Sequence, residues 1–129
     1  MSPVVALDCM GGDAGPATVL AGAALARERY PRLRFRLFGD RLRIEAELER
    51  HKGLSGAAEI VHTDAEVLAT DKPSHALRRG RDSSMGRAIM EVREGRAHVA
   101  VSAGNTGALM AMAKLMLRTQ DGIDRPALA

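Results

Sequence analysis

The stretch from Val99 to Ala108 places a short apolar run directly before a turn of small residues and an apolar helix. The first turn of a helix has backbone N–H groups without partners and carries partial positive charge. Gly104 and Gly107 let a ligand approach the backbone closely. The polar side chains of the turn add hydrogen-bond donors, and they belong to Ser102, Asn105 and Thr106. The stretch therefore predicts a site for a phosphate-like anion.

Short apolar runs alternate with amphipathic segments along the whole chain. The runs at 4–7, 35–38, 59–62 and 98–101 predict strands, and the segments at 16–29, 41–51, 84–94 and 106–118 predict helices. Asp40 and either Ser83 or Ser84 are suited to cap two of these helices. The alternation predicts an α/β layered fold with a mostly parallel sheet. The last helix is apolar almost all round, which predicts burial on more than one side.

The chain has 129 residues, enough for one domain with a core. Because only Tyr30, Phe35 and Phe38 are aromatic, that core must consist mainly of aliphatic residues and methionine. The segment 125–129 reads as the beginning of another strand, and a parallel sheet needs cover on both faces. We therefore expect residues 1–129 to be the N-terminal part of one larger α/β domain, incomplete at its C-terminus.

Composition and charge argue against several classes of protein. A formal net charge of +3 and a pI near 9.6 suit anionic ligands or acidic partners, but basic and aromatic residues are not interleaved as in nucleic-acid binders. The histidines lack metal-ligand spacing, so no metal is expected. Cys9 cannot form an internal disulfide and is interpreted as a small buried residue. With no secretory signal and no apolar run long enough to span a bilayer, we expect a cytoplasmic protein.

Three loops are expected at the carboxyl ends of the strands, where parallel α/β sheets bind ligands. The loop at 8–15 holds glycines and two aspartates, which we expect to orient the loop rather than to act as a base. The loop at 71–85 is rich in serine and arginine, and the third loop spans 102–107. Taken alone, each loop is also consistent with a tight turn or a solvent-exposed surface that has no binding function. None of the three contains a Walker motif. Together they favour an anion site; the residues concerned in the first two loops are Asp8, Gly11, Gly12, Asp13, Ser74, Arg78 and Ser84.

These loops resemble one family, the bacterial phosphate acyltransferases called PlsX. The matching residues are 6–13 with Gly15-Pro16, then 72–74 with 76–78 and 84–85, and finally 101–108, in which Ser-Ala-Gly-Asn-Thr-Gly is the most specific string. The family usually has alanine where Cys9 stands, which agrees with a non-catalytic role for this cysteine. The match covers under half of a full-length member.

The resemblance implies a Rossmann-like three-layer αβα fold akin to isopropylmalate dehydrogenase and phosphotransacetylase. It implies transfer of a fatty acyl group from acyl carrier protein to inorganic phosphate, without a cofactor, by a homodimer. The acyl phosphate would supply a membrane glycerol-3-phosphate acyltransferase in phospholipid synthesis, so peripheral contact with the inner face of the membrane stays open. We expect the 129 residues alone to be inactive.

The predicted site combines both lines of reasoning. Asn105 and Thr106 are the expected catalytic residues, and the expected substrate- or phosphate-binding residues are Asp8, Gly11, Gly12, Asp13, Ser74, Arg78, Ser84, Ser102, Gly104 and Gly107. Three alternatives remain at this point. One is a phosphotransacetylase-like enzyme that uses acyl-coenzyme A, and another is a module that binds a phosphorylated metabolite without turning it over. The third, on charge alone, is a nucleic-acid binder.

Overall fold

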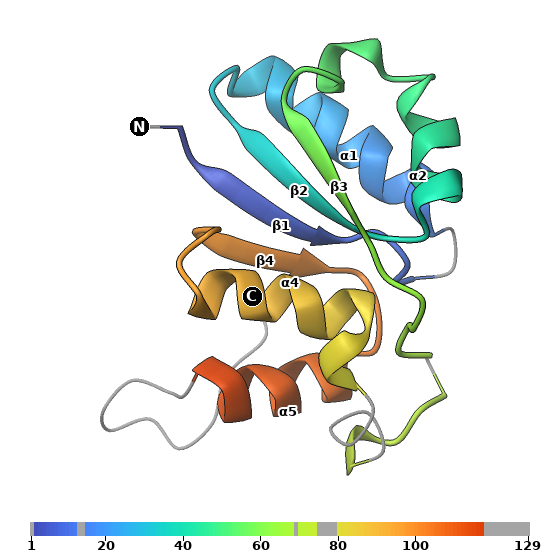
Figure 1. The fold of residues 1–129 in the computed structure, drawn as a ribbon, viewed down its shortest axis with the longest axis vertical. Helices are drawn as coiled ribbons and strands as arrows, with labels where there is room; N and C mark the ends of the chain where they lie inside the picture. The colour runs from blue at the N-terminus through green and yellow to red at the C-terminus, as the bar shows by residue number, and fades with distance from the viewer. Residues whose placement is uncertain (1, 13–14, 69, 75–79, 118–129) are drawn as a thin grey trace.

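The computed structural model describes residues 2–12, 15–68, 70–74 and 80–117, apart from the side chains of Thr106 and Leu115. Strands and helices alternate as predicted (Figure 1). The strands are β1 (Val4–Asp8), β2 (Arg34–Gly39), β3 (Ala58–His62) and β4 (Val99–Ser102). The helices are α1 (Pro16–Arg29), α2 (Arg41–Leu48), α4 (Ser84–Arg93) and α5 (Thr106–Leu117), with short 3₁₀ helices at Lys52–Leu54 and Gly80–Asp82.

The four strands form one parallel sheet in the order β3-β2-β1-β4. Leu7 in β1 lies opposite Leu37 in β2 on one side and opposite Val101 in β4 on the other. The chain winds outward from β1 to β3 and then crosses back to β4, so the winding direction reverses between β1 and β4. In open parallel sheets such a reversal point opens a crevice at the carboxyl ends of the strands, where ligands bind.

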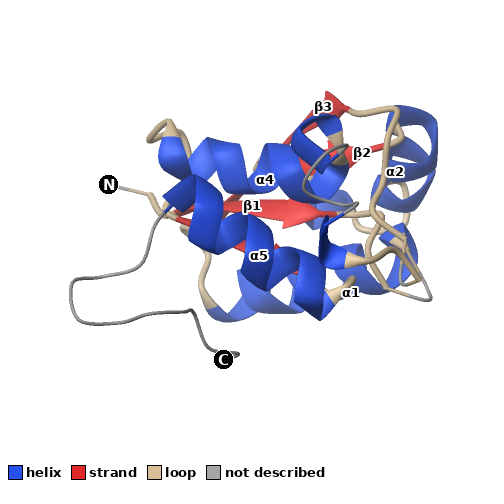
Figure 2. Cartoon of the chain, turned by 90° about the horizontal axis from the view of Figure 1, so that it is seen from below, coloured by secondary structure: helices blue, strands red, loops and turns tan. Residues whose placement is uncertain are grey.

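Helices cover both faces of the sheet (Figures 1 and 2). On the face of α1 and α2, Leu20 and Ile44 pack with Leu37 of β2 in an aliphatic core. On the opposite face, Ala88 of α4 packs against Ala6 and Phe38. The alternation of neighbouring strand residues between the two cores follows from the pleat of a strand. The structure thus confirms the layered α/β fold.

Local sequence signals set several helix boundaries. The carboxylate of Asp40 accepts a hydrogen bond from Leu42 N at 3.2 Å and caps α2. Ser83 caps α4 by accepting from Gly86 N at 3.0 Å. α2 is shorter than predicted and ends at Leu48, because Arg50 N and His51 N bond back only three residues in tight turns.

α5 is predicted to be buried on several sides; within the described residues one stripe of it is fully buried, and Leu109, Met110, Ala111 and Ala113 are partly buried. Ala108, Met112 and Met116 are buried and form one stripe that packs against Met85 and Ile89 of α4. Residues spaced by four share one face of a helix, so a single neighbour suffices to cover them. Among the described helices and strands, α4 is the main neighbour of this helix, and Val67 packs against the same stripe.

β4 lies at one edge of the described sheet, and Val99 and Val101 are 47% and 49% exposed there. The predicted strand at 125–129 falls outside the described residues. Among the residues that are described, no helix has both the length and the apolar character needed to cross a membrane.

The start of α4 packs on the preceding turn without room for a side chain. A Cβ on Gly86 would lie 1.9 Å from the carbonyl oxygen of Gly80. We expect Gly86→Ala to lower the free energy of unfolding by about 2 kcal/mol, since overpacking forces the backbone apart. Gly22→Ala in α1 is the matched control, because nothing lies within 4 Å of its added Cβ; it should raise the stability by about 0.5–1 kcal/mol. Urea unfolding followed by circular dichroism measures both, and equal stabilities would contradict the packing described.

Candidate functional site

The loops that follow β1 and β4 meet at the reversal point of the sheet, where Gly11 packs against Gly104. A Cβ on Gly11 would lie 2.9 Å from Gly104 N, and a Cβ on Gly104 would lie 3.2 Å from the Cα of Gly11. Gly12 has a φ of +85°, a conformation that a residue with a side chain rarely adopts. The predicted glycines therefore allow the two backbones to approach closely. Gly11 is buried in this contact.

Asp8, the last residue of β1, organises both loops through its buried carboxylate. Oδ1 accepts from Met10 N and Gly11 N, both at 3.1 Å, and from Ser84 Oγ at 2.6 Å. Oδ2 accepts from Ser102 Oγ at 2.7 Å, and Ser102 Oγ in turn accepts from Gly104 N. Asp8 and Ser84 are 2% and 0% exposed. Both residues therefore support the loops from within the protein, and neither is exposed enough to contact a ligand.

Asn105 links the start of α5 to the loop that follows β3. Its Oδ1 accepts from Ala108 N at 3.0 Å and caps the helix, while its Nδ2 donates to Leu68 O at 3.1 Å and to Asp71 O at 2.7 Å. An asparagine amide has two N–H donors, so both are used within the protein. The backbone amides of Thr106 and Gly107 belong to the first helical turn and have no intrahelical acceptor. An anion at this helix start would therefore meet backbone amides rather than the side chain of Asn105.

The loop around Pro73 lies against the same helix start. A Cβ on Gly107 would approach Pro73 Cγ to 3.1 Å. Lys72 and Ser74, on either side of that proline, are exposed. The structure thus brings parts of all three predicted loops to one edge of the sheet. Asp13 and Arg78 lie outside the described residues.

A cavity of about 230 Å³, here named the glycine cleft, opens between these loops. Met10 and Gly12 line it after β1, Ala103 and Gly104 after β4, and residues 66–68 on the third side. Met10 and residues 66–68 were not among the predicted site residues. Residues 66–68 are held beside the cleft by a parallel bridge between Ala65 and Ser83 and by a hydrogen bond from Ser84 N to Ala65 O. No local pattern signals such a contact between distant residues.

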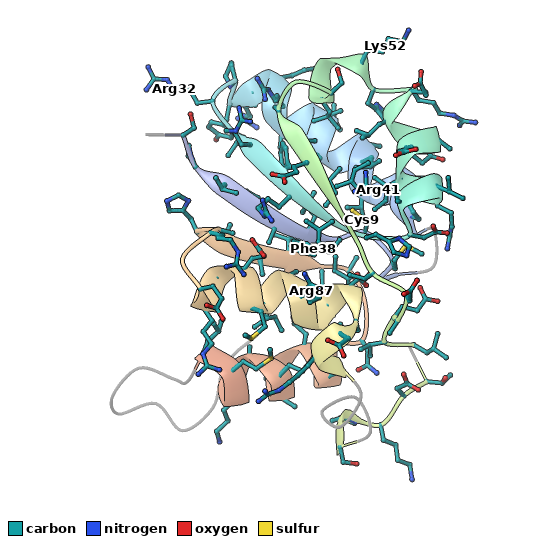
Figure 3. The ribbon with its side chains drawn as sticks, viewed as in Figure 1. Cys9, Arg32, Phe38, Arg41, Lys52 and Arg87 are labelled. Carbon is teal, nitrogen blue, oxygen red and sulfur yellow. The ribbon has the colours of Figure 1, made fainter. Side chains whose placement is uncertain are left out.

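Cys9 follows Asp8 but does not face this cleft as a reactive thiol. It is 0% exposed and lies in the core on the α1 side of the sheet, within the body of the molecule (Figure 3). Burial, and secondarily the charge of Asp8, raise the pKa of Cys9 to about 12. The thiolate is the nucleophilic form of cysteine. At neutral pH this residue is therefore an inert core residue, as the sequence predicts.

A sequence profile described as "Fatty acid synthesis protein" matches residues 4–129. The chain belongs to this family. Proteins named phosphate acyltransferase are similar to it: one from Bradyrhizobium diazoefficiens is 61% identical over 125 residues, 96% of this chain. Others from Rhodopseudomonas palustris (strain BisB5) and Erythrobacter litoralis are 59% and 54% identical over 97% and 98% of this chain. These matches confirm the resemblance predicted from the loop motifs.

The same matches cover 35–36% of each relative. The chain therefore spans about a third of the length of the curated relatives that it matches. In this member of the family, the segments that follow β1, β3 and β4 line one cleft.

Proposed function

We propose that this chain contributes the phosphate-binding edge of an acyltransferase that moves a fatty acyl group from acyl carrier protein to inorganic phosphate. The observation that carries the proposal is the glycine cleft, which lies at the reversal point of the sheet and whose wall at Gly104 is two residues before α5 begins. Helix starts with close glycine backbone bind phosphate well. The name borne by the similar proteins supports phosphate as the acyl acceptor.

In the proposed reaction, a phosphate oxygen attacks the thioester carbonyl and forms a C–O bond. The tetrahedral intermediate collapses with cleavage of the C–S bond, giving acyl phosphate and the carrier thiolate, which takes up a proton. Phosphate is already an oxyanion at neutral pH, so the protein mainly positions the reactants and stabilises charge. We assign that task to the backbone amides of Thr106 and Gly107.

The remaining predicted residues act in support. Asn105 holds the helix start against the loop at 68–71, and Asp8 holds the loops after β1 and β4 together. Glu66 places a carboxylate on one wall of the cleft, so cations must balance it when phosphate binds. We assign this role to Lys72 and Arg78 of the loop at 71–85, with Asp13 orienting the loop after β1.

The wider setting is part of the same proposal. Residues 1–129 form the N-terminal part of one phosphate acyltransferase domain, which acts in the cytoplasm as a homodimer without a cofactor. Its acyl phosphate is consumed by a membrane glycerol-3-phosphate acyltransferase. Because we propose that acyl carrier protein binds as an acidic partner, we expect its binding to weaken as the salt concentration rises.

A chimera tests the activity. In it, this chain replaces the 125 matching residues of the Bradyrhizobium diazoefficiens relative. The chimera should form acyl phosphate from acyl carrier protein thioester and inorganic phosphate, at a higher kcat/KM than from the coenzyme A thioester. The 129-residue chain alone should form none. A folded chimera without product, or with a preference for coenzyme A, would contradict the proposed donor.

A further inference from the structure

A second cavity adjoins the glycine cleft along the carboxyl edge of the sheet. It measures about 300 Å³ and lies beyond the ends of β2 and β3. Met10 and Glu66 line both cavities, so the two are adjacent and share a wall. We name it the Thr63 cavity, because Thr63 forms part of its wall. Nothing in the proposed transfer to phosphate uses this space.

Thr63 brings a polar group that the protein leaves unused. The residue is 6% exposed, and its Oγ1 is buried without a hydrogen-bond partner among the described residues. Its backbone is fixed by a bond from Thr63 N to Gly39 O at 2.9 Å. Native proteins satisfy nearly all buried hydroxyls, so an unsatisfied one beside a cavity needs an explanation. Rotation about χ1 redirects the hydroxyl, and a ligand in the cavity would then supply its partner.

The charge of the cavity wall selects the kind of ligand. Asp40, Asp64 and Glu66 contribute carboxylates, and among the described residues no lysine or arginine lines the cavity. His62 accepts from Arg41 N through Nδ1, and its Nε2 lies 2.7 Å from Asp64 Oδ1. The wall therefore offers acceptors and repels anions, which excludes phosphate. Within the described part of the chain, no three His, Cys, Asp or Glu side chains are grouped to hold a metal ion. An uncharged ligand with N–H and O–H donors fits best.

We propose that the Thr63 cavity binds the amide-bearing pantetheine arm of the thioester donor, with Thr63 as a specificity-determining residue. This inference rests on the proposed function: phosphate binds at the glycine cleft, so the thioester carbonyl that it attacks must lie beside it there. The arm then runs from that carbonyl past Met10 and Glu66, and its amide N–H and hydroxyl groups face the acceptors of the cavity. The two cavities thereby separate the substrates by charge, with the phosphate at the start of α5 and the neutral arm beside β3.

The test compares two donors in the chimera: an acyl-pantetheine thioester and an acyl ethanethiol ester, which has no amide. Thr63→Val removes the hydroxyl at nearly constant shape. One hydrogen bond corresponds to about a fivefold effect, so the ratio of kcat/KM for the first donor over the second should fall by about that factor. Thr18→Val is the matched control at an exposed position in α1, and its ratio should equal that of the parent. An unchanged ratio in Thr63→Val would overturn the assignment.

A binding measurement distinguishes failure of this inference from failure of the proposed function. Free pantetheine should shift the amide NMR signals of Thr63, Asp64 and Ala65 in the chimera, and inorganic phosphate should not. If pantetheine leaves these signals unmoved while acyl phosphate still forms, the Thr63 cavity is not the arm site and the proposed function stands. If neither donor yields acyl phosphate, the proposed function fails, and a shift confined to the cavity would still support its ligand class. Equal melting temperatures of Thr63→Val and parent exclude a folding defect.

Discussion

Asp8→Ala is expected to lower the free energy of unfolding of the chain by about 3–5 kcal/mol. The substitution leaves two backbone amides and two hydroxyl groups without the carboxylate that accepts from them. Such groups are costly in a site that is 2% exposed, because water cannot replace the lost partner. Urea unfolding followed by circular dichroism measures the loss. A variant already unfolded without urea agrees with the expectation, and a loss below about 1 kcal/mol contradicts it.

Two further variants show whether the loss comes from the hydrogen bonds themselves. Asp8→Asn keeps an acceptor where Oδ1 receives three bonds, and Ser102 Oγ can turn to accept from the new amide. Its loss should therefore be about 1–2 kcal/mol, smaller than that of Asp8→Ala. Asp64→Ala removes a carboxylate whose side chain is 95% exposed, and it should change the stability by under about 0.5 kcal/mol.

Asn105→Ala is expected to reduce the turnover of the chimera by about 100-fold while leaving it folded. The variant loses the bonds to Leu68 O and Asp71 O, which tie the start of α5 to the loop that follows β3. The backbone amides assigned to phosphate then lose their fixed position. Loss of the cap on Ala108 N adds about 1 kcal/mol of instability. Steady-state formation of acyl phosphate and thermal unfolding measure the two effects.

Asn105→Ser separates the capping of α5 by Asn105 from its hydrogen bonds to Leu68 O and Asp71 O. Serine is a good capping residue, so the helix start should keep most of its stability. It has no amide group to reach Leu68 O and Asp71 O, and we therefore expect turnover nearly as low as in Asn105→Ala. Turnover of the serine variant within a few-fold of the parent would show that these two bonds are not needed and would remove Asn105 from the site.

Much of the fold was predictable because its signals are local. Asp40 and Ser83 act as caps at the predicted places, since a capping side chain bonds to its own helix two or three residues on. The parallel sheet follows from the alternation of strands and helices. The strand predicted at 98–101 is shifted by one residue, because Ser102 continues the pairing of β4 with Asp8. Boundaries of this kind depend on the neighbouring strand rather than on the strand itself.

The arrangement within the site was less predictable. The loops at 8–15 and 102–107 were identified, but the bond from Ser84 to Asp8 joins residues 76 positions apart. Ser84 thus supports the site from beneath, where a ligand contact was expected. The cavity wall at 66–68 and the unsatisfied hydroxyl of Thr63 are not signalled by any motif. The wall depends on the bridge between Ala65 and Ser83, and the position of Thr63 depends on its bond to Gly39. Sequence patterns indicate which residues are polar but not which of them the fold already satisfies.

The position of bound phosphate tests the central claim most directly. A crystal structure of the chimera with inorganic phosphate should place one phosphate in the glycine cleft, with an oxygen about 3 Å from the backbone nitrogen of Thr106 or Gly107. Phosphate bound only at another place, such as the arginine-rich opposite edge near Arg29 and Arg32, would contradict the assignment of this helix start as the anion site.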